Sequence, residues 1–371
     1  MADVPEAVVP VDPATAEAQP TPAATPPEKA SENTAEKTAE KPPEKPAGPA
    51  EHNRIGLNYR KPWPRPKVTG LVIDYHTHLF AHRHQKEWLA ANKHFGIDAF
   101  ITMTPLEEAA AVQRDLVGRV QFIAIPNWFS DSADWVDDWL RRLEAFYNLG
   151  SRIIKFHMAP QTIERRKANL EHPGIQKIIK EAVARNMILM THVGDPDTWY
   201  GGKYTDTAKF GTREEHYRMW EGQLESQRGR PWVGAHLGGN PENPAYLQTL
   251  LDRFPDLYLD LSATRWMVRE VSARRDAMRE FVIRNADRLL WGSDQVSGDK
   301  RDFDFLASRL WAHRKLWETA YVGPTPIHDP DLPEDQQPML RGLALPDDVL
   351  QKIYHDNVTK LLAKHGVHFQ E

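Results

Sequence analysis

From about residue 68 onward, short β-rich runs alternate with amphipathic helical stretches. Apolar runs rich in Val and Ile predict buried strands, and we assign eight of them: 71–76, 97–103, 120–126, 152–157, 187–192, 232–236, 257–261 and 289–293. The helical stretches between them include 133–149, 174–185, 245–254 and 269–286. Eight such units predict an α/β fold, with a parallel sheet closed into a (β/α)8 TIM barrel. A doubly wound open sheet is the alternative, but its Gly-x-Gly-x-x-Gly turn does not follow the first strand.

Three regions depart from this alternation. Residues 1–66 are rich in Pro, Ala, Glu and Lys, and no aromatic residue precedes Tyr59. Such a segment buries too little apolar surface to offset its ordering entropy, so we predict a disordered tail before a domain at 67–371. Residues 193–230 form a long loop after the fifth strand, which serves either as a lid or substrate wall or as a structural or oligomer-contact insertion. A proline-rich loop at 323–346 leads to a final helix at 347–364.

Composition excludes several classes of function. The formal net charge of −5 gives no indication of a nucleic-acid or anionic-membrane partner. The absence of cysteine excludes a disulfide scaffold, a thiolate metal site and a cysteine nucleophile. The chain does not begin with a secretory signal, and no apolar run approaches the ~20 residues needed to span a bilayer. We therefore expect a soluble, cytoplasmic protein that acts on a small molecule.

Two histidine pairs share the same spacing. His76 and His78 fall at the C-terminal end of the first predicted strand, where side chains at i and i+2 point to the same face. Two imidazoles then converge on one point, as a divalent cation requires. His82 and His84 repeat the spacing, but no apolar strand precedes them. We expect this second pair to lie in a solvated loop and helix start.

Later strands also end in residues that can bind a metal. The fourth strand ends in Lys155-Phe156-His157, the fifth in Thr191-His192, the sixth in Ala235-His236 and the eighth in Gly292-Ser293-Asp294. Barrel enzymes build their active sites at the C-terminal ends of the strands. We therefore expect these side chains to meet His76 and His78 at one mouth of the barrel.

The order of these motifs resembles the amidohydrolase superfamily. Within it, the chain is most similar to the amidohydrolase-related group that also contains aminocarboxymuconate-semialdehyde decarboxylase. The resemblance covers about residues 70–362 and leaves the tail out. Asp260-Leu261-Ser262 on the seventh strand and Asn357 in the last helix also fit the family. The matching pieces are Asp74-Tyr75-His76-Thr77-His78, Thr191-His192-Val193-Gly194, Ala235-His236-Leu237-Gly238-Gly239 and Leu290-Trp291-Gly292-Ser293-Asp294.

The resemblance implies a metal held by His76, His78, His192 and Asp294, with His236 close by. Three imidazoles and a carboxylate suit one Zn²⁺, with Mn²⁺, Fe²⁺ and Co²⁺ as alternatives. A bound water would have its pKa lowered toward ~7 and supply hydroxide. Asp294 would then accept the water's proton and pass it to a leaving group. His236 would orient the water or polarise a substrate oxygen.

Four further residues are candidates for a second metal or a substrate contact: Lys155, His157, His236 and Arg265. In binuclear members of the superfamily a lysine on the fourth strand is carboxylated and bridges two metals. Lys155 has about that position, but the most similar group works with one metal, so we favour one ion, with Lys155 instead binding a substrate carboxylate. Arg265 follows the seventh strand, where it contacts an anionic or planar substrate or forms a salt bridge.

Two other stretches receive ordinary structural interpretations. Residues 269–284 are read as a solvated helix face, and Asp195-Pro196-Asp197 is read as a turn. The leading hypothesis for function is metal-dependent hydrolysis of a C–N or C–O bond in an amide, lactone or ester. The alternative is non-oxidative decarboxylation of an unsaturated or aromatic acid, and a third reading is a barrel that binds a small molecule without catalysis. A homodimer is expected only from the resemblance.

Overall fold

The sheet at the centre of the molecule closes on itself. In the computed structural model, which describes residues 51–128 and 132–370, the strands run in the order β8-β7-β6-β5-β4-β3-β2-β1-β9. All neighbours in this sheet are parallel, and β9 pairs with β1. Since β9 follows β8 in the chain, the two together form the eighth stave of a (β/α)8 barrel. The predicted fold is confirmed.

Each of the eight predicted runs overlaps one of the strands β1 to β8. The six residues of β1, β4 and β5 are buried throughout, as expected for strands covered on both faces. The strands are β1 (Ile73–His78), β2 (Ala99–Thr102), β3 (Val120–Ala124), β4 (Ile153–Met158), β5 (Ile188–Val193), β6 (Trp232–Gly234), β7 (Leu257–Asp260), β8 (Leu289–Leu290) and β9 (Gln295–Val296).

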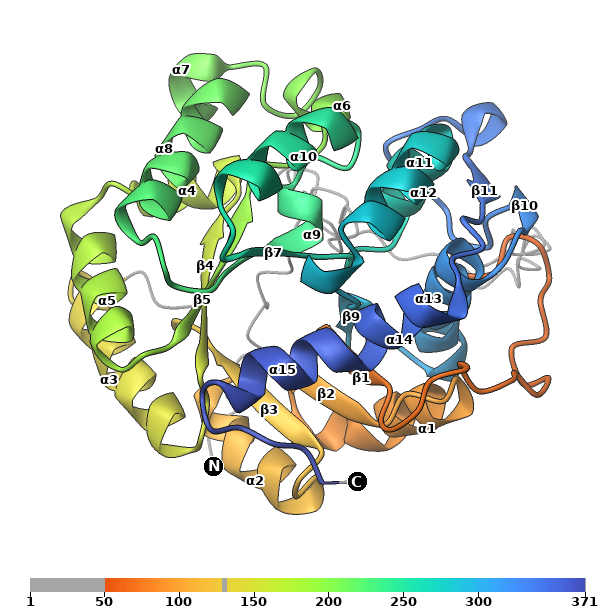
Figure 1. The fold of residues 1–371 in the computed structure, drawn as a ribbon, viewed down its shortest axis with the longest axis horizontal. Helices are drawn as coiled ribbons and strands as arrows, with labels where there is room; N and C mark the ends of the chain where they lie inside the picture. The colour runs from red at the N-terminus through yellow and green to blue at the C-terminus, as the bar shows by residue number, and fades with distance from the viewer. Residues whose placement is uncertain (1–50, 129–131, 371) are drawn as a thin grey trace, which may run out of the picture.

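Helices enclose these strands (Figure 1). The predicted helices at 133–149, 174–185 and 245–254 correspond to α3, α5 and α10. The helices are α1 (Gln85–His94), α2 (Leu106–Asp115), α3 (Trp135–Asn148), α4 (Pro160–Arg166), α5 (Pro173–Ala184), α6 (Asp197–Tyr200), α7 (Thr207–Phe210), α8 (Arg213–Ser226), α9 (Ala235–Gly238), α10 (Pro244–Arg253), α11 (Arg265–Ala273), α12 (Arg275–Arg284), α13 (Phe303–Glu318), α14 (Asp347–Gln351) and α15 (Asn357–Ala363).

The stretch predicted as one helix at 269–286 is two helices, α11 and α12, and its first turns are not solvated. Arg269 and Glu270 are 8% and 7% exposed. Arg269 pairs with Glu270 at 2.8 Å and with Asp329 at 2.6 Å, and it donates to the hydroxyl of Thr198 at 2.8 Å. The prediction of a solvated face is wrong here because two distant segments cover α11, and a buried charge needs such partners.

The long connection after β5 carries α6, α7 and α8. Helix α8 begins with a capping box, in which Thr212 and Glu215 bond to each other's backbone N–H. Trp199 is buried in this connection and its indole N–H donates to Asp331 at 2.5 Å. The connection is therefore anchored to the C-terminal segment.

The C-terminal segment is more structured than the predicted loop. Strands β10 (Val322–Pro324) and β11 (Met339–Arg341) form an antiparallel pair within it. The predicted last helix is present as α14, a wider π-helical turn and α15. The amide of Asn357 donates to the carbonyls of Ala286 and Leu289 at 2.6 and 2.8 Å, so this helix holds the start of β8.

The packed part of the chain begins before residue 67. Tyr59 is 3% exposed, and Trp63 lies 5.6 Å from Phe95 and 6.2 Å from Trp311, ring centre to ring centre. The boundary at residue 66 is therefore placed too late, because these aromatic side chains pack on the barrel. The disorder predicted for residues 1–50 lies outside the described residues. Within the part of the chain that the structure describes, no helix is both long and apolar enough to cross a membrane.

Candidate metal centre

The eighth stave is interrupted where it meets β1. Asp294 lies between β8 and β9 in the left-handed region, at φ 53°, and its N–H donates to the carbonyl of His76 at 2.8 Å. A Cβ on Gly292 would lie only 2.8 Å from the Cβ of His76, so glycine allows the two strands to approach closely. Aspartate tolerates the left-handed conformation better than most residues. This break places the Asp294 carboxylate beside the histidines of β1.

Three ligand atoms come together at this point. The Nε2 atom of His78 lies 3.0 Å from Oδ1 of Asp294, and the Nε2 atom of His76 lies 3.5 Å from the same oxygen. All three side chains are buried. Two ligands about 2.1 Å from a tetrahedral ion are about 3.4 Å apart, so these spacings fit a small divalent cation.

The other ring nitrogen of His76, Nδ1, is held by two neighbouring side chains. This atom lies 2.9 Å from Asp260 and 2.8 Å from the hydroxyl of Ser262. A carboxylate on one ring nitrogen keeps the proton there and leaves the other nitrogen to a metal. Burial, and then the neighbouring Lys155 ammonium, lower the pKa of His76 to about 4, so the ring is neutral at neutral pH, as a ligand must be.

Asp260 organises two histidines at once. Its Oδ1 accepts hydrogen bonds from the N–H of His236 at 2.8 Å and the N–H of Ser262 at 3.1 Å. The hydroxyl of Ser262 also lies 2.8 Å from Nδ1 of His236. Burial alone would raise the pKa of Asp260, but His76 and His236 hold it below its usual range. His76, His236 and Asp260 form a second close group of ligand atoms, which shares His76 with the first.

Asp74 connects β1 to the eighth stave beneath the site. Its Oδ1 accepts from the N–H groups of Ser293 at 2.9 Å and His76 at 3.2 Å. Burial raises the pKa of this carboxyl to about 7. The backbone on both sides of the candidate site is therefore fixed by one buried side chain.

Lys155 reaches the site from β4. Its Nζ lies 2.9 Å from Nε2 of His76, and the side chain is fully buried. His157, two residues later, has its Nδ1 2.9 Å from the hydroxyl of Thr162. Lys155 is thus the strand-four candidate that contacts His76 of the three-ligand group.

Four histidine rings form a row at the strand ends. Their centroids are separated by 4.8 Å from His76 to His236, by 4.7 Å from His236 to His192 and by 4.5 Å from His192 to His157. The predicted ligand His192 is thus adjacent to the site, but it joins neither close group of ligand atoms among the described residues. Its Nε2 faces Oδ1 of Asp195 at 3.1 Å.

Asp195 is a residue that the sequence-based interpretation missed. It is fully buried, and its Oδ2 accepts a hydrogen bond from the phenol of Tyr204 at 2.8 Å. Its reading as a simple turn residue is wrong because the connection after β5 folds back over it. The available signal was its position three residues after His192 at the end of a strand.

His236 lies in an unusual turn. It and Leu237 adopt left-handed conformations at φ 56° and 53°, and Gly238 and Gly239 follow at 62° and 68°. Each non-glycine residue in this region costs roughly 1–2 kcal/mol. A Cβ on Gly239 would lie 2.3 Å from the carbonyl oxygen of Val193, so glycine is needed there. Backbone strain of this kind is typical of functional sites.

A basic recess adjoins Asp294. Arg265, Arg301 and Arg309 line it together with Asp294, Thr264, Val296 and Phe305. The guanidinium of Arg309 lies 3.4 Å above the centre of the Phe305 ring, and that of Arg301 lies 5.1 Å from it. Three arginines against one carboxylate give the recess a net positive charge. The prediction named only Arg265, because Arg301 and Arg309 come from the segment after β9.

The molecule is a barrel with side chains at its strand ends that could hold a metal ion. Comparison with known proteins assigns the class. The family model described as Amidohydrolase matches residues 73–364, and the chain belongs to this family of the amidohydrolase superfamily. The predicted membership of the amidohydrolase superfamily, a superfamily of enzymes, is confirmed. Comparison with curated protein sequences finds no match.

The solved structures that match this chain are distant in sequence. A TIM-barrel protein from Bordetella bronchiseptica is 17% identical, with 77% of this chain and 84% of that chain covered and a TM-score of 0.45. A 5-carboxyvanillate decarboxylase from Novosphingobium aromaticivorans, complexed with manganese, is 11% identical, with coverages of 80% and 99% and a TM-score of 0.45. A 4-oxalomesaconate hydratase from Rhodopseudomonas palustris is 11% identical, with coverages of 79% and 96% and a TM-score of 0.43.

Proposed function

We propose that this protein is a metal-dependent hydrolase that cleaves a C–N or C–O bond of a small anionic molecule. The observation that carries the proposal is the buried convergence of His76, His78 and Asp294, with Nε2–Oδ1 distances of 3.5 and 3.0 Å. Asp260 and Ser262 support this geometry, because they hold the opposite side of His76. Such an arrangement costs desolvation of several polar groups, which a bound cation offsets.

We propose one divalent ion, most simply Zn²⁺, which His76, His78 and Asp294 would hold, with His192 as a further candidate ligand. When bound, the ion supplies Lewis acidity and an activated water. The Asp294 carboxylate accepts a proton from the attacking water and returns it to the leaving group. His236, whose Nδ1 is fixed by Ser262, polarises the substrate oxygen.

The basic recess favours a substrate that carries a carboxylate. Arg265, Arg301 and Arg309 line one small recess of about 10 Å³ together with Asp294, and planar guanidinium groups match carboxylates in two-point hydrogen bonds. Stacking on Phe305 restricts the motion of Arg301 and Arg309 in advance of binding. We assign these three arginines to substrate orientation.

The same recess favours decarboxylation as the second candidate function. A carboxylate oriented beside the ion-binding residues can itself be the leaving group: its C–C bond breaks, CO₂ departs, and a proton replaces it on the carbon. Asp294 or His236 would deliver that proton. Lys155, buried 2.9 Å from His76, would hold the substrate in either reaction.

A single screen distinguishes these functions. Purified full-length protein is stripped of metal, reloaded with Zn²⁺ or Mn²⁺, and offered carboxylate-bearing amides, lactones, esters and aromatic acids in H₂¹⁸O. Incorporation of ¹⁸O into the organic product supports hydrolysis, and CO₂ release with an unlabelled organic product supports decarboxylation. Metal binding with neither product would support a barrel that only binds small molecules. Failure to take up either ion would contradict both enzymatic proposals.

A further inference from the structure

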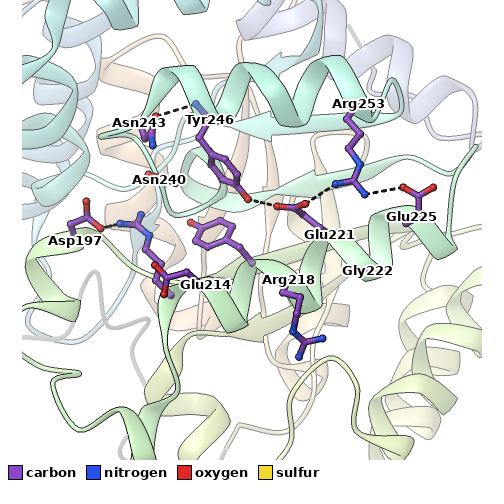
Figure 2. A pocket seen from close by; sticks show the side chains of 12 residues that line it. Asp197, Glu214, Arg218, Glu221, Gly222, Glu225, Asn240, Asn243, Tyr246 and Arg253 are labelled. Carbon is purple, nitrogen blue, oxygen red and sulfur yellow. Dashed lines mark hydrogen bonds and ion pairs between the residues drawn. The ribbon is translucent and has the colours of Figure 1, made fainter.

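A groove of about 730 Å³ lies between α8 and α10, apart from the metal centre (Figure 2). This volume falls in the range of pockets that hold small organic ligands. None of its lining residues belongs to the candidate metal site or the basic recess. The lining residues are Asp197, Arg213, Glu214, Tyr217, Arg218, Glu221, Gly222, Glu225, Asn240, Asn243, Tyr246 and Arg253.

Two tyrosine rings form the inner surface of the groove. The rings of Tyr217 and Tyr246 are 5.4 Å apart and perpendicular. Both phenols already donate inside the protein, Tyr217 to the carbonyl of Gly238 at 2.5 Å and Tyr246 to Glu221 at 2.6 Å. The rings therefore offer aromatic surface to a ligand, and aromatic faces attract cations.

The α8 wall leaves room for a ligand at Gly222. Arg218, Glu221, Gly222 and Glu225 follow helical spacing along α8. In Figure 2 Glu221 and Glu225 point toward Arg253 of α10, whereas Arg218 points away. No atom lies within 4 Å of a Cβ built on Gly222. The α8 wall of the groove is thus open at Gly222, between the paired carboxylates of Glu221 and Glu225.

Each arginine of the groove is already paired with a carboxylate. Arg213 pairs with Asp197 and Glu242, Arg218 pairs with Glu171 at 2.9 Å, and Arg253 pairs with Glu221 at 2.8 Å and with Glu225 at 3.3 Å. These pairs remove most of the groove's capacity to attract an anion.

The recognition groups that remain are acceptors. Among the described residues, Glu214 forms no ion pair, and the buried Oδ1 of Asn240 receives no hydrogen bond. Four lining residues are acidic and three are basic, so the formal charge of the lining is −1. The same ion pairs occupy Glu221 and Glu225, so the groups left for a ligand are Glu214, the Oδ1 atom of Asn240 and the tyrosine rings. These groups suit a ligand that donates hydrogen bonds and carries positive charge.

We propose that the groove between α8 and α10 binds a small organic cation with a planar body, such as an aromatic amidinium or amine. The planar body packs on Tyr217 and Tyr246, and the cationic group faces Glu214 of α8 and the Oδ1 atom of Asn240. The site lies behind the segment that carries His236, because Tyr217 and Arg213 donate to the carbonyls of Gly238 and Gly239. The inference is independent of the proposed reaction, since no lining residue takes part in it.

Benzamidine, with neutral benzamide as its near-isostere, provides the test. Calorimetric titration of the full-length, metal-loaded protein is expected to show saturable binding of benzamidine and at least about tenfold weaker binding of benzamide. The Gly222→Leu variant places a branched side chain on the α8 wall of the groove, where a Cβ has open space, so it is expected to weaken benzamidine binding at least about tenfold. Gly222→Ala adds one methyl group and is expected to bind as the natural chain does.

Three results would overturn the proposal. Benzamidine fails to saturate the protein, benzamide binds equally well, or Gly222→Leu binds benzamidine unchanged, which would place the ligand elsewhere. Both variants replace glycine in an exposed part of a helix with better helix formers, so loss of folding does not confuse the result. Metal content, measured on the same samples, separates failure of this site from failure of the metal centre.

Discussion

Two histidine pairs with the same spacing lie in different surroundings, one buried and one not. His76 and His78 lie on β1 and are buried. His82 and His84 lie a few residues later, in a short helical turn with no buried residue. Both pairs contact carboxylates, so neither spacing nor partner type distinguishes them.

The carboxylates themselves differ in exposure. The side chains of Asp260 and Asp294, which contact the first pair, are fully buried. Those of Asp115 and Asp299, which contact the second pair, are 43% and 54% exposed. Water and salt screen the exposed contacts, whereas a buried group of acceptors strongly favours an added cation. Strand context and burial, rather than the His-x-His pattern, therefore define the candidate site.

Removing the two histidine pairs in turn should give the largest difference in bound Zn²⁺. We expect wild-type protein to hold about one equivalent of Zn²⁺ after dialysis, and the His76→Ala/His78→Ala variant to hold less than about a tenth of that, because two imidazole ligands are lost. The matched His82→Ala/His84→Ala variant should keep its full equivalent. Elemental analysis by mass spectrometry measures both. Equal loss from the two variants would show that burial does not separate the pairs.

Changing the carboxylates that contact the two histidine pairs should have a smaller effect on Zn²⁺ affinity. Asp260→Asn removes the charge that orients His76 and should lower Zn²⁺ affinity by about 10- to 100-fold, as is usual for groups that hold a metal ligand. Asp115→Asn, the matched change beside His82, should leave the affinity unchanged. Competition with a chromophoric chelator measures both values. An unaffected Asp260→Asn variant would contradict the role given to this residue.

Lys155 should have the smallest effect on how many ions bind. Its ammonium lies 2.9 Å from the inward nitrogen of His76 and opposes an incoming cation. Lys155→Met should therefore keep one equivalent of metal and bind it at least as tightly as the natural chain. A fall from two equivalents to one would instead indicate that Lys155 bridges two ions, and the one-metal proposal would be abandoned. The stoichiometry is read from the same titration.

Much of this arrangement follows from local sequence. The eight strands are evident because strands covered on both faces appear in the sequence as short apolar runs. Parallel strands in a barrel bring their C-terminal ends to one mouth. That rule alone brings His76 and His78 together with Asp294. The position of His236 beside His76 follows from the same rule. The left-handed turn that carries His236 could not be foreseen from its residues.

The errors share one physical cause, which is burial by distant segments. Arg269 looks like a solvated helix residue until Asp329, far along the chain, covers it. Asp195 looks like a turn until Tyr204 folds back onto it. Tyr59 precedes the barrel in sequence yet belongs to the buried hydrophobic cluster of the domain. Periodicity reports which face of an element is apolar, but it does not report which remote segment covers a polar one.

The most direct test of the account is to locate the ion. Crystals of the full-length protein reloaded with Zn²⁺ can be measured on both sides of the zinc absorption edge. The account predicts one strong anomalous peak in contact with His76, His78 and Asp294, with the Lys155 amine displaced from His76, and no peak at His82 and His84. A peak confined to the surface pair, or none at the buried one, would contradict the central claim that β1 and Asp294 form a metal centre.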